Sequence, residues 1–223
     1  MKIAIMQPYV FPYLGYFQLY NSVDLFISLE DVNYIRGGWI NRNKIMVEGS
    51  PTYITFPIRD VSQNRPITQH YIYWDGIWNK KLLKKIRYAY GKEKHFDDIY
   101  PHIEILFSRH GPDSVSSFAM TCLTYIGDQL GITTKTRWSL GYSKENKGQE
   151  RLIDICKSEK ADMYINAIGG KELYNPDDFY LEGIELRFIK RADNENDLSI
   201  IDILMRRGWE ETSELVKQYE LVE

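Results

Sequence analysis

The opening stretch, residues 1–29, constrains the fold most, because two short apolar runs there flank a proline-containing loop and a helical pattern. Lys2 to Met6 is typical of a buried strand, and Gln7-Pro8 ends it, since proline cannot continue a central ladder. Leu14 to Ser22 shows helical spacing, and Val23 to Leu29 forms a second apolar run. This order of strand, loop, helix and strand predicts the first unit of an α/β sheet.

The rest of the chain continues this alternation and places helices in its middle. We expect strands at 67–73, 133–140, 163–166 and 184–189, a hairpin over 44–58 with its turn at 48–51, and helices at 75–90, 96–107, 114–131, 150–158, 199–205 and 210–219. Gly111-Pro112 separates two of these helices.

The predicted fold is α/β: a mainly parallel, Rossmann-like sheet with flanking helices and a mostly helical insertion or covering layer at about 75–131. At 223 residues the chain is expected to form one domain over 1–223, because cores divide only beyond about 250 residues.

The charge balance argues against general binding to polyanions. The chain carries 28 Lys and Arg against 31 Asp and Glu, a net charge of −3. No field of the whole molecule therefore attracts nucleic acid or an anionic membrane. The net charge does not exclude a local basic site. The outer face of the helix expected at 75–90 is basic and carries Lys80, Lys81, Lys84, Lys85 and Arg87.

The start of the chain, the lack of a long apolar segment and the cysteines predict a cytoplasmic protein. The start has one charge and a very short apolar run, unlike a secretory signal. No segment approaches the roughly 20 apolar residues that span a bilayer, so we expect no membrane insertion. Cys122 and Cys156 lack a CxxC or Cys/His spacing and are interpreted as buried thiols, which fits a reducing compartment.

No metal is expected either, because the four histidines lack ligand spacing; they are His70, His95, His102 and His110. Gly-x-Ser-x-Gly, HExxH, Walker A and CxxC motifs are also missing. The chain therefore lacks the best-known sequence signatures of hydrolases, metalloproteases, ATPases and thiol-redox proteins.

Three loops follow the carboxyl ends of expected strands, where parallel sheets collect ligands: residues 7–15, 30–44 and 166–174. The first is rich in aromatic residues and leads into a helix N-terminus, whose free amides can receive an anion. Its candidate binding residues are Gln7, Tyr9, Tyr13, Gly15 and Tyr16. The alternative is a buried turn shaped by its prolines.

This first loop occupies the position at which class I nucleotidyltransferases carry a His-x-Gly-His motif. The corresponding residues here are Tyr13-Leu14-Gly15-Tyr16, so both histidines are missing. Nucleotidyl transfer by that mechanism is therefore not supported by this motif.

The second loop concentrates a carboxylate, amides and cations in one connection. Asp31 could act as a general base or hold a substrate amine, Asn41 could bind hydroxyls or a carbonyl, and Arg42 and Lys44 could neutralise phosphate. Its further candidates are Asn33, Tyr34 and Trp39. The alternative is a solvated hairpin whose charges have no function.

Further candidates lie later in the chain. Gly169-Gly170 after the strand that ends at Asn166 would let a backbone approach a ligand closely, although no dinucleotide or P-loop spacing is present. Lys147 and Arg151 lie at a helix start, where they could meet phosphate or form a salt-bridged face.

Stretches spread over almost the whole chain carry a specific resemblance to a known family. They are residues 6–9, 11–19, 31–35, 38–43, 150–156, 161–166, 169–170 and 198–205. With these stretches the chain resembles the WbqC-like family. Members of that family tend to lie among genes for O-antigen and related surface polysaccharides, so the resemblance implies a role in making or decorating an activated sugar.

The resemblance implies an N-acyl or aminoacyl transferase, glycyl being one candidate group, that acts on a nucleotide-linked amino sugar with an activated acyl donor. The phosphates would then lie near Arg42, Lys44 or Lys147, the amine near Asp31, and Asn33 could contact the oxyanion. Two alternatives stay open: an adenylating enzyme that uses the first loop with Lys147 or Arg151, and a non-catalytic sugar-binding protein.

Overall fold

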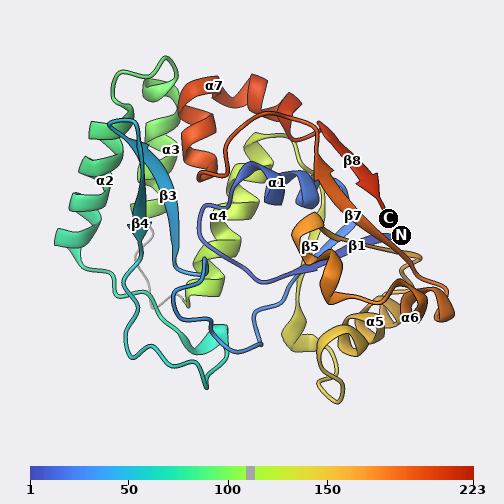
Figure 1. The fold of residues 1–223 in the computed structure, drawn as a ribbon. Coiled ribbons are helices and arrows are strands. Elements are labelled where there is room, and N and C mark those ends of the chain that lie inside the picture. The colour runs from blue at the N-terminus through green and yellow to red at the C-terminus, as the bar shows by residue number, and fades with distance from the viewer. Residues whose placement is uncertain (109–113) are drawn as a thin grey trace.

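The computed structural model describes residues 1–108 and 114–223, and a six-stranded sheet forms its centre. The strands are β1 (Lys2–Met6), β2 (Leu25–Ser28), β5 (Lys135–Trp138), β6 (Met163–Ala167), β7 (Glu185–Arg191) and β8 (Tyr219–Val222). Their order is β5-β2-β1-β6-β7-β8, and every pair is parallel except β7 with β8 (Figure 1). The mainly parallel α/β sheet predicted from the sequence is confirmed.

Helices and one hairpin surround this sheet. The helices are α1 (Leu14–Asn21), α2 (Gly76–Tyr90), α3 (Phe96–Ser108), α4 (Val115–Gln129), α5 (Gly148–Ser158), α6 (Pro176–Leu181) and α7 (Ile200–Leu215). The hairpin pairs β3 (Arg42–Val47) with β4 (Ser50–Thr55), and 3₁₀ turns lie at Ile67–Gln69, Ser139–Gly141 and Ile168–Leu173.

Alternating side chains of β1 explain why both faces of the sheet are covered. Ile3 and Ile5 pack in a cluster with α5 and with Phe179 of α6. Ala4 faces the opposite way, into a larger cluster that includes Phe17 of α1 and residues of α4 and α7. A strand buried on both faces is an almost unbroken apolar run, which is what residues 2–6 display.

The middle of the chain extends the larger cluster beyond the sheet. Figure 1 shows α2, α3 and the β3–β4 hairpin together at one side of the molecule. Phe56, just after β4, lies 5.6 Å from the ring of Phe107 in α3 and 5.2 Å from that of Phe118 in α4. These ring contacts join the hairpin to α3 and α4, and the hydrophobic cluster to which they belong also contains Ala4 of β1 and Phe26 of β2.

Residues 67–73 do not form the expected strand. The 3₁₀ turn Ile67–Gln69 occupies its start, and the N–H of Ile67 donates to the carbonyl of Val32. Residues 71 and 72 join isolated bridges. Ile67 and Ile72 are buried, while Gln69 and Tyr71 are exposed. A turn followed by extended chain thus produces the same alternation of polar and apolar residues as a strand.

The C-terminal region differs from expectation in two elements. The helix expected at 210–219 ends at Leu215, and Tyr219–Val222 forms β8 instead, because its backbone groups pair with the open edge of β7. Helix α6 was not predicted, although Asn175 caps it and Pro176 opens it.

The hairpin turn is shorter than expected. Glu48 and Gly49 both have positive φ, 48° and 76°, and Val47 pairs directly with Ser50. Such a two-residue turn matches the twist of the strands, so pairing begins before Pro51. The expected break at Gly111-Pro112 lies outside the described residues.

Gly208 forms the kink that divides α7, as the predicted break between two terminal helices required. Its φ of 74° and ψ of −178° are open essentially to glycine, and a Cβ there would lie 2.6 Å from Nδ1 of His95.

We expect Gly208→Ala to lower the free energy of unfolding by about 2 kcal/mol in urea denaturation. Gly76→Ala, where a Cβ meets nothing within 4 Å, should be neutral or stabilising. Equal effects of the two substitutions would contradict this reasoning.

Candidate functional site

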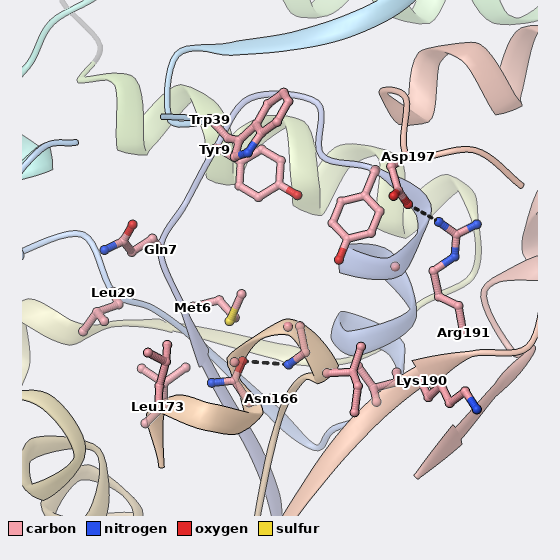
Figure 2. Close-up of a pocket in the computed structure, with 18 of the residues that line it drawn as sticks. Met6, Gln7, Tyr9, Leu29, Trp39, Asn166, Leu173, Lys190, Arg191 and Asp197 are labelled. Atoms are coloured by element: carbon pink, nitrogen blue, oxygen red, sulfur yellow. Dashed lines mark hydrogen bonds and ion pairs between the residues drawn. The ribbon is translucent and has the colours of Figure 1, made fainter. Parts of the chain in front are cut away.

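A cleft of about 980 Å³ opens at the carboxyl ends of β1, β6 and β7 (Figure 2). Ligand sites of open parallel sheets lie at this edge. The side chains and backbone that line it are Ile5, Met6, Gln7, Tyr9, Tyr13, Gly15, Leu29, Trp39, Asn43, Asn166, Ala167, Ile168, Gly169, Gly170, Leu173, Tyr174, Ile189, Lys190, Arg191 and Asp197. The cleft thus collects Gln7, Tyr9, Tyr13, Gly15, Trp39, Asn166, Gly169 and Gly170 from the predicted residues.

Aromatic side chains from two loops form one wall of the cleft. Tyr9 and Trp39 lie across it from Asn166 and Leu173 (Figure 2). Burial raises the pKa of the Tyr9 hydroxyl, and burial with the charge of Asp197 does the same for Tyr13. Both hydroxyls therefore stay protonated at neutral pH and can donate hydrogen bonds to a ligand.

The loop that carries Tyr9 and Tyr13 is held rigidly by distant segments. Phe11 has a left-handed φ of 44°, and its carbonyl accepts hydrogen bonds from Asn43 Nδ2 at 2.5 Å and Ser199 Oγ at 2.9 Å. The strained backbone persists because β3 and the start of α7 fix it. Such rigidity keeps the aromatic wall in place before a ligand arrives.

The N-terminus of α1 also borders the cleft. Tyr13 is its N-cap residue, and the side chain of Tyr13 makes no capping hydrogen bond. A Cβ at Gly15 would lie 2.5 Å from the ring of Tyr13 and 3.1 Å from Cδ of Arg191, so glycine is required by the packing. The first-turn amides and the helix dipole favour an anion at this end of the cleft.

Polar groups at the end of β6 form the opposite side. Asn166 Nδ2 donates to the hydroxyls of Tyr164 at 2.8 Å and Tyr174 at 2.7 Å, while its Oδ1 accepts from the N–H of Ala167 at 2.7 Å. A Cβ at Gly169 would meet nothing within 4 Å. Asn166 is thus fixed in position, and the backbone of the following turn is accessible to a ligand.

Arg191 is the cation that β7 brings to the cleft. Its guanidinium pairs with Asp193 and donates to Asp197 Oδ1 at 2.6 Å. The side chain of Asp193 is 2% exposed, whereas that of Asp197 is 82% exposed. Asp197 is therefore the partner that a ligand could replace. The ammonium of Lys190 points away from the cleft in Figure 2.

Asp31 and Arg151 lie outside the lining and bind each other. Arg151 Nη1 and Nη2 donate to the two carboxylate oxygens of Asp31 at 3.0 Å and 2.7 Å, and Ser139 Oγ donates to Oδ1 at 2.6 Å. Lys144 adds an ion pair at 3.0 Å. Burial alone would raise the pKa of Asp31, but these donors lower it to about 2. A carboxylate with its lone pairs occupied in this way is a weak base at neutral pH.

The pH dependence of stability should report this carboxylate. Because its folded pKa lies below the usual value of 3.8, Asp31 stabilises the fold above about pH 4, and this contribution is lost as pH falls towards about 2. As pH falls from neutral towards 2, the free energy of unfolding of Asp31→Asn should decrease by about 2 kcal/mol less than that of the unaltered chain. Urea unfolding at several pH values measures this difference. The same acid slope in both proteins would contradict the assignment.

Tyr34 and Asn41 belong to a packed network outside the lining. The hydroxyl of Tyr34 donates to Asn41 Oδ1 at 2.8 Å, and Asn41 Nδ2 donates to the carbonyl of Phe56 at 2.7 Å. The ring of Tyr34 stacks on His70 at 4.4 Å. Tyr16 is likewise buried, and its hydroxyl donates a hydrogen bond to the carbonyl of Gln7. These groups support the loops that carry the cleft.

The predicted cations lie outside the lining as well. Arg42 binds the carbonyl of Gly38, and its guanidinium lies over the ring of Tyr53. Lys44 Nζ lies 5.7 Å from the ring centre of Trp39, beside the cleft wall. Asn33 and Lys147 are exposed on the surface. The structure therefore does not gather the second loop's polar groups at one point.

Lys190, Arg191 and Asp197 are the charged residues of the cleft lining that the sequence interpretation missed. The rule that selected the loops after β1, β2 and β6 applies equally to β7, whose carboxyl end is Arg191. Applying it to the strand expected at 184–189 would have pointed to this region.

Within the described residues, no group of three His, Cys, Asp or Glu side chains could hold a metal ion. His70 and His102 make hydrogen bonds to Pro66 and Tyr125, and His110 lies outside the described residues. In the same part of the chain, no helix has both the length and the apolar character to cross a bilayer.

Comparisons with known proteins agree with the resemblance described above. The model of the WbqC-like protein family matches residues 7–214. The uncharacterized protein Rv1507c of Mycobacterium tuberculosis is 29% identical over 167 residues, which cover 74% of this chain and 71% of that protein. No solved structure gives a significant match.

Proposed function

The chain belongs to the WbqC-like protein family, and we propose that it transfers an acyl or aminoacyl group to a nucleotide-linked amino sugar in the synthesis of O-antigen or another surface polysaccharide. The aromatic cleft at the carboxyl edge of the sheet carries this proposal. Aromatic faces stack on sugars and bases, and hydroxyl and amide groups beside them bind sugar hydroxyls.

The two ends of the cleft suit the two halves of such a substrate. The α1 N-terminus and Arg191 favour a phosphate, with Asp197 released from its ion pair. Trp39 supplies a stacking face, Tyr9 a hydroxyl donor, and the open backbone at Gly169 further polar groups for a sugar or a base. The overall arrangement fits an elongated anionic ligand with many hydroxyls.

The proposed reaction joins the sugar amine to the acyl carbon of a thioester or acyl phosphate. A nitrogen–carbon bond forms, the bond from the acyl carbon to its leaving group breaks, and the departing thiolate or phosphate takes up the one proton that the amine gives up. Protonated Tyr9 and Tyr13 hydroxyls are suitable donors for the tetrahedral oxyanion, and Asp197 is a carboxylate of the lining that can hold the amine. A base role for Asp31 stays a prediction, weakened by its bonds to Arg151.

Mass spectrometry tests the proposal directly. Purified protein is incubated with nucleotide-linked amino sugars and with acyl or aminoacyl thioesters, and a mass gain on the sugar is expected. Absence of both turnover and binding across the panel would refute the proposal. Binding without turnover, with normal polysaccharide in cells that carry Asp197→Asn, would favour a non-catalytic sugar-binding protein.

An adenylating enzyme is a second candidate, because the N-terminus of α1 follows the loop after β1 at the cleft, and its N-cap Tyr13 makes no side-chain capping bond. Such an end can hold a triphosphate. Pyrophosphate exchange into ATP in the presence of glycine or another acid would favour adenylation. Acyl transfer from a preformed thioester without ATP would favour the first proposal.

A further inference from the structure

All charged side chains of α2 are cationic. They are Lys80, Lys81, Lys84, Lys85 and Arg87, and no acidic residue occurs between Gly76 and Tyr90. The whole chain has a net charge of −3. The positive charge of α2 is therefore a local concentration that contrasts with the rest of the molecule.

The lysines share the outward face of α2 with two exposed apolar side chains. Ile77, Lys81, Lys84 and Tyr88 are spaced by four, three and four residues, which places them on one stripe of the helix. Ile77 is 66% exposed and Tyr88 is 67% exposed. The opposite face is buried through Asn79, Leu82, Ile86 and Tyr90.

The described ion pairs leave these lysines unneutralised. No described ion pair includes a residue of α2. The nearby acid Asp75 caps the helix by accepting from the N–H of Ile77, and Glu48 accepts from the hydroxyl of Tyr88. Lys85 Nζ donates to the carbonyl of Tyr53. Among the residues that the structure describes, the ammonium groups of Lys81 and Lys84 therefore have no ion-pair partner.

We infer that the outward face of α2 docks the protein on the surface of an anionic phospholipid bilayer. Clustered lysines on an amphipathic helix attract anionic headgroups, and exposed Ile77 and Tyr88 can enter the headgroup region. Figure 1 shows α2 at the outer edge of the molecule, beside the hairpin and α3. The helix would lie on the bilayer without crossing it, and this inference does not depend on the proposed function.

A bilayer fits this face better than a nucleic acid. The guanidinium of Arg87 lies 4.5 Å from the ring centre of Tyr100 and is occupied there. The remaining cations of α2 are lysines, which act as point charges and lack the planar fork that reads bases. A convex helix surface also lacks the groove that usually follows a single strand.

Vesicle flotation with the full chain tests the docking surface. We expect binding to vesicles of phosphatidylcholine with an equal part of phosphatidylglycerol, and little binding to phosphatidylcholine alone. About 1 M salt should abolish it, because the Debye length falls to about 3 Å. Lys81→Gln/Lys84→Gln should weaken binding about 25-fold, about fivefold for each lysine.

The matched control is Lys135→Gln/Lys160→Gln, which removes the same charge from exposed positions away from α2. It should keep near-normal binding. Equal weakening by both variants, no preference for the anionic vesicles, or no binding at all would overturn the inference. So would binding of single-stranded RNA that depends on α2 in a protein that ignores vesicles.

Discussion

Unfolding of Arg151→Met is expected to require about 3 kcal/mol less free energy than unfolding of the unaltered chain, because it leaves a buried carboxylate without its main partner. The side chain of Asp31 is 1% exposed and that of Arg151 is 8% exposed. Ser139 and Lys144 remain as partners of Asp31, so the loss should fall at the lower end of the range for broken buried pairs. Urea denaturation followed by tryptophan fluorescence measures it.

Two further variants separate this explanation from a general effect of losing a cation. Lys157→Met removes an ion pair with Glu182 whose side chains are 51% and 42% exposed, and should cost less than about 1 kcal/mol. Asp31→Leu/Arg151→Met should lose less stability than Arg151→Met alone, because no unpaired charge stays buried. A double variant as unstable as the single one would argue against the buried charge as the cause.

Local patterns predicted the elements that carry the cleft. The apolar run at residues 2–6, its break at Gln7-Pro8 and the helix from Leu14 correspond directly to β1, the first loop and α1. Short-range periodicity and proline chemistry determine these features, so a single sequence reveals them. β8 depends instead on pairing with β7, and nothing within residues 219–222 indicates that pairing.

The candidate site was predicted unevenly for the same reason. Gln7, Tyr9 and Tyr13 follow the end of a strand and line the cleft, as the strand-end rule predicts. Asp31 also follows a strand, but its carboxylate is bound by Arg151, which is 120 residues away in the chain. The sequence of the loop alone does not show that the guanidinium of Arg151 binds the carboxylate of Asp31 in the folded chain.

Loss of the aromatic ring of Trp39 is expected to weaken binding of a nucleotide-linked amino sugar about 50-fold, because replacing a stacking ring by alanine costs about 1–3 kcal/mol. Trp39 lines the cleft, and its side chain is 46% exposed, so Trp39→Ala should change the fold little. Isothermal titration with uridine diphosphate glucosamine and its relatives measures the effect. Trp39→Phe should restore part of the affinity, since a smaller ring remains.

Trp138 offers a matched control for this substitution. It is 45% exposed and lies on the edge strand β5, outside the cleft lining. Trp138→Ala removes the same ring at the same exposure, so a general effect of losing a tryptophan would appear in both variants. A loss of affinity confined to Trp39→Ala would locate ligand binding in the cleft. Equal losses, or unchanged binding in Trp39→Ala, would mean that the aromatic wall does not hold the substrate.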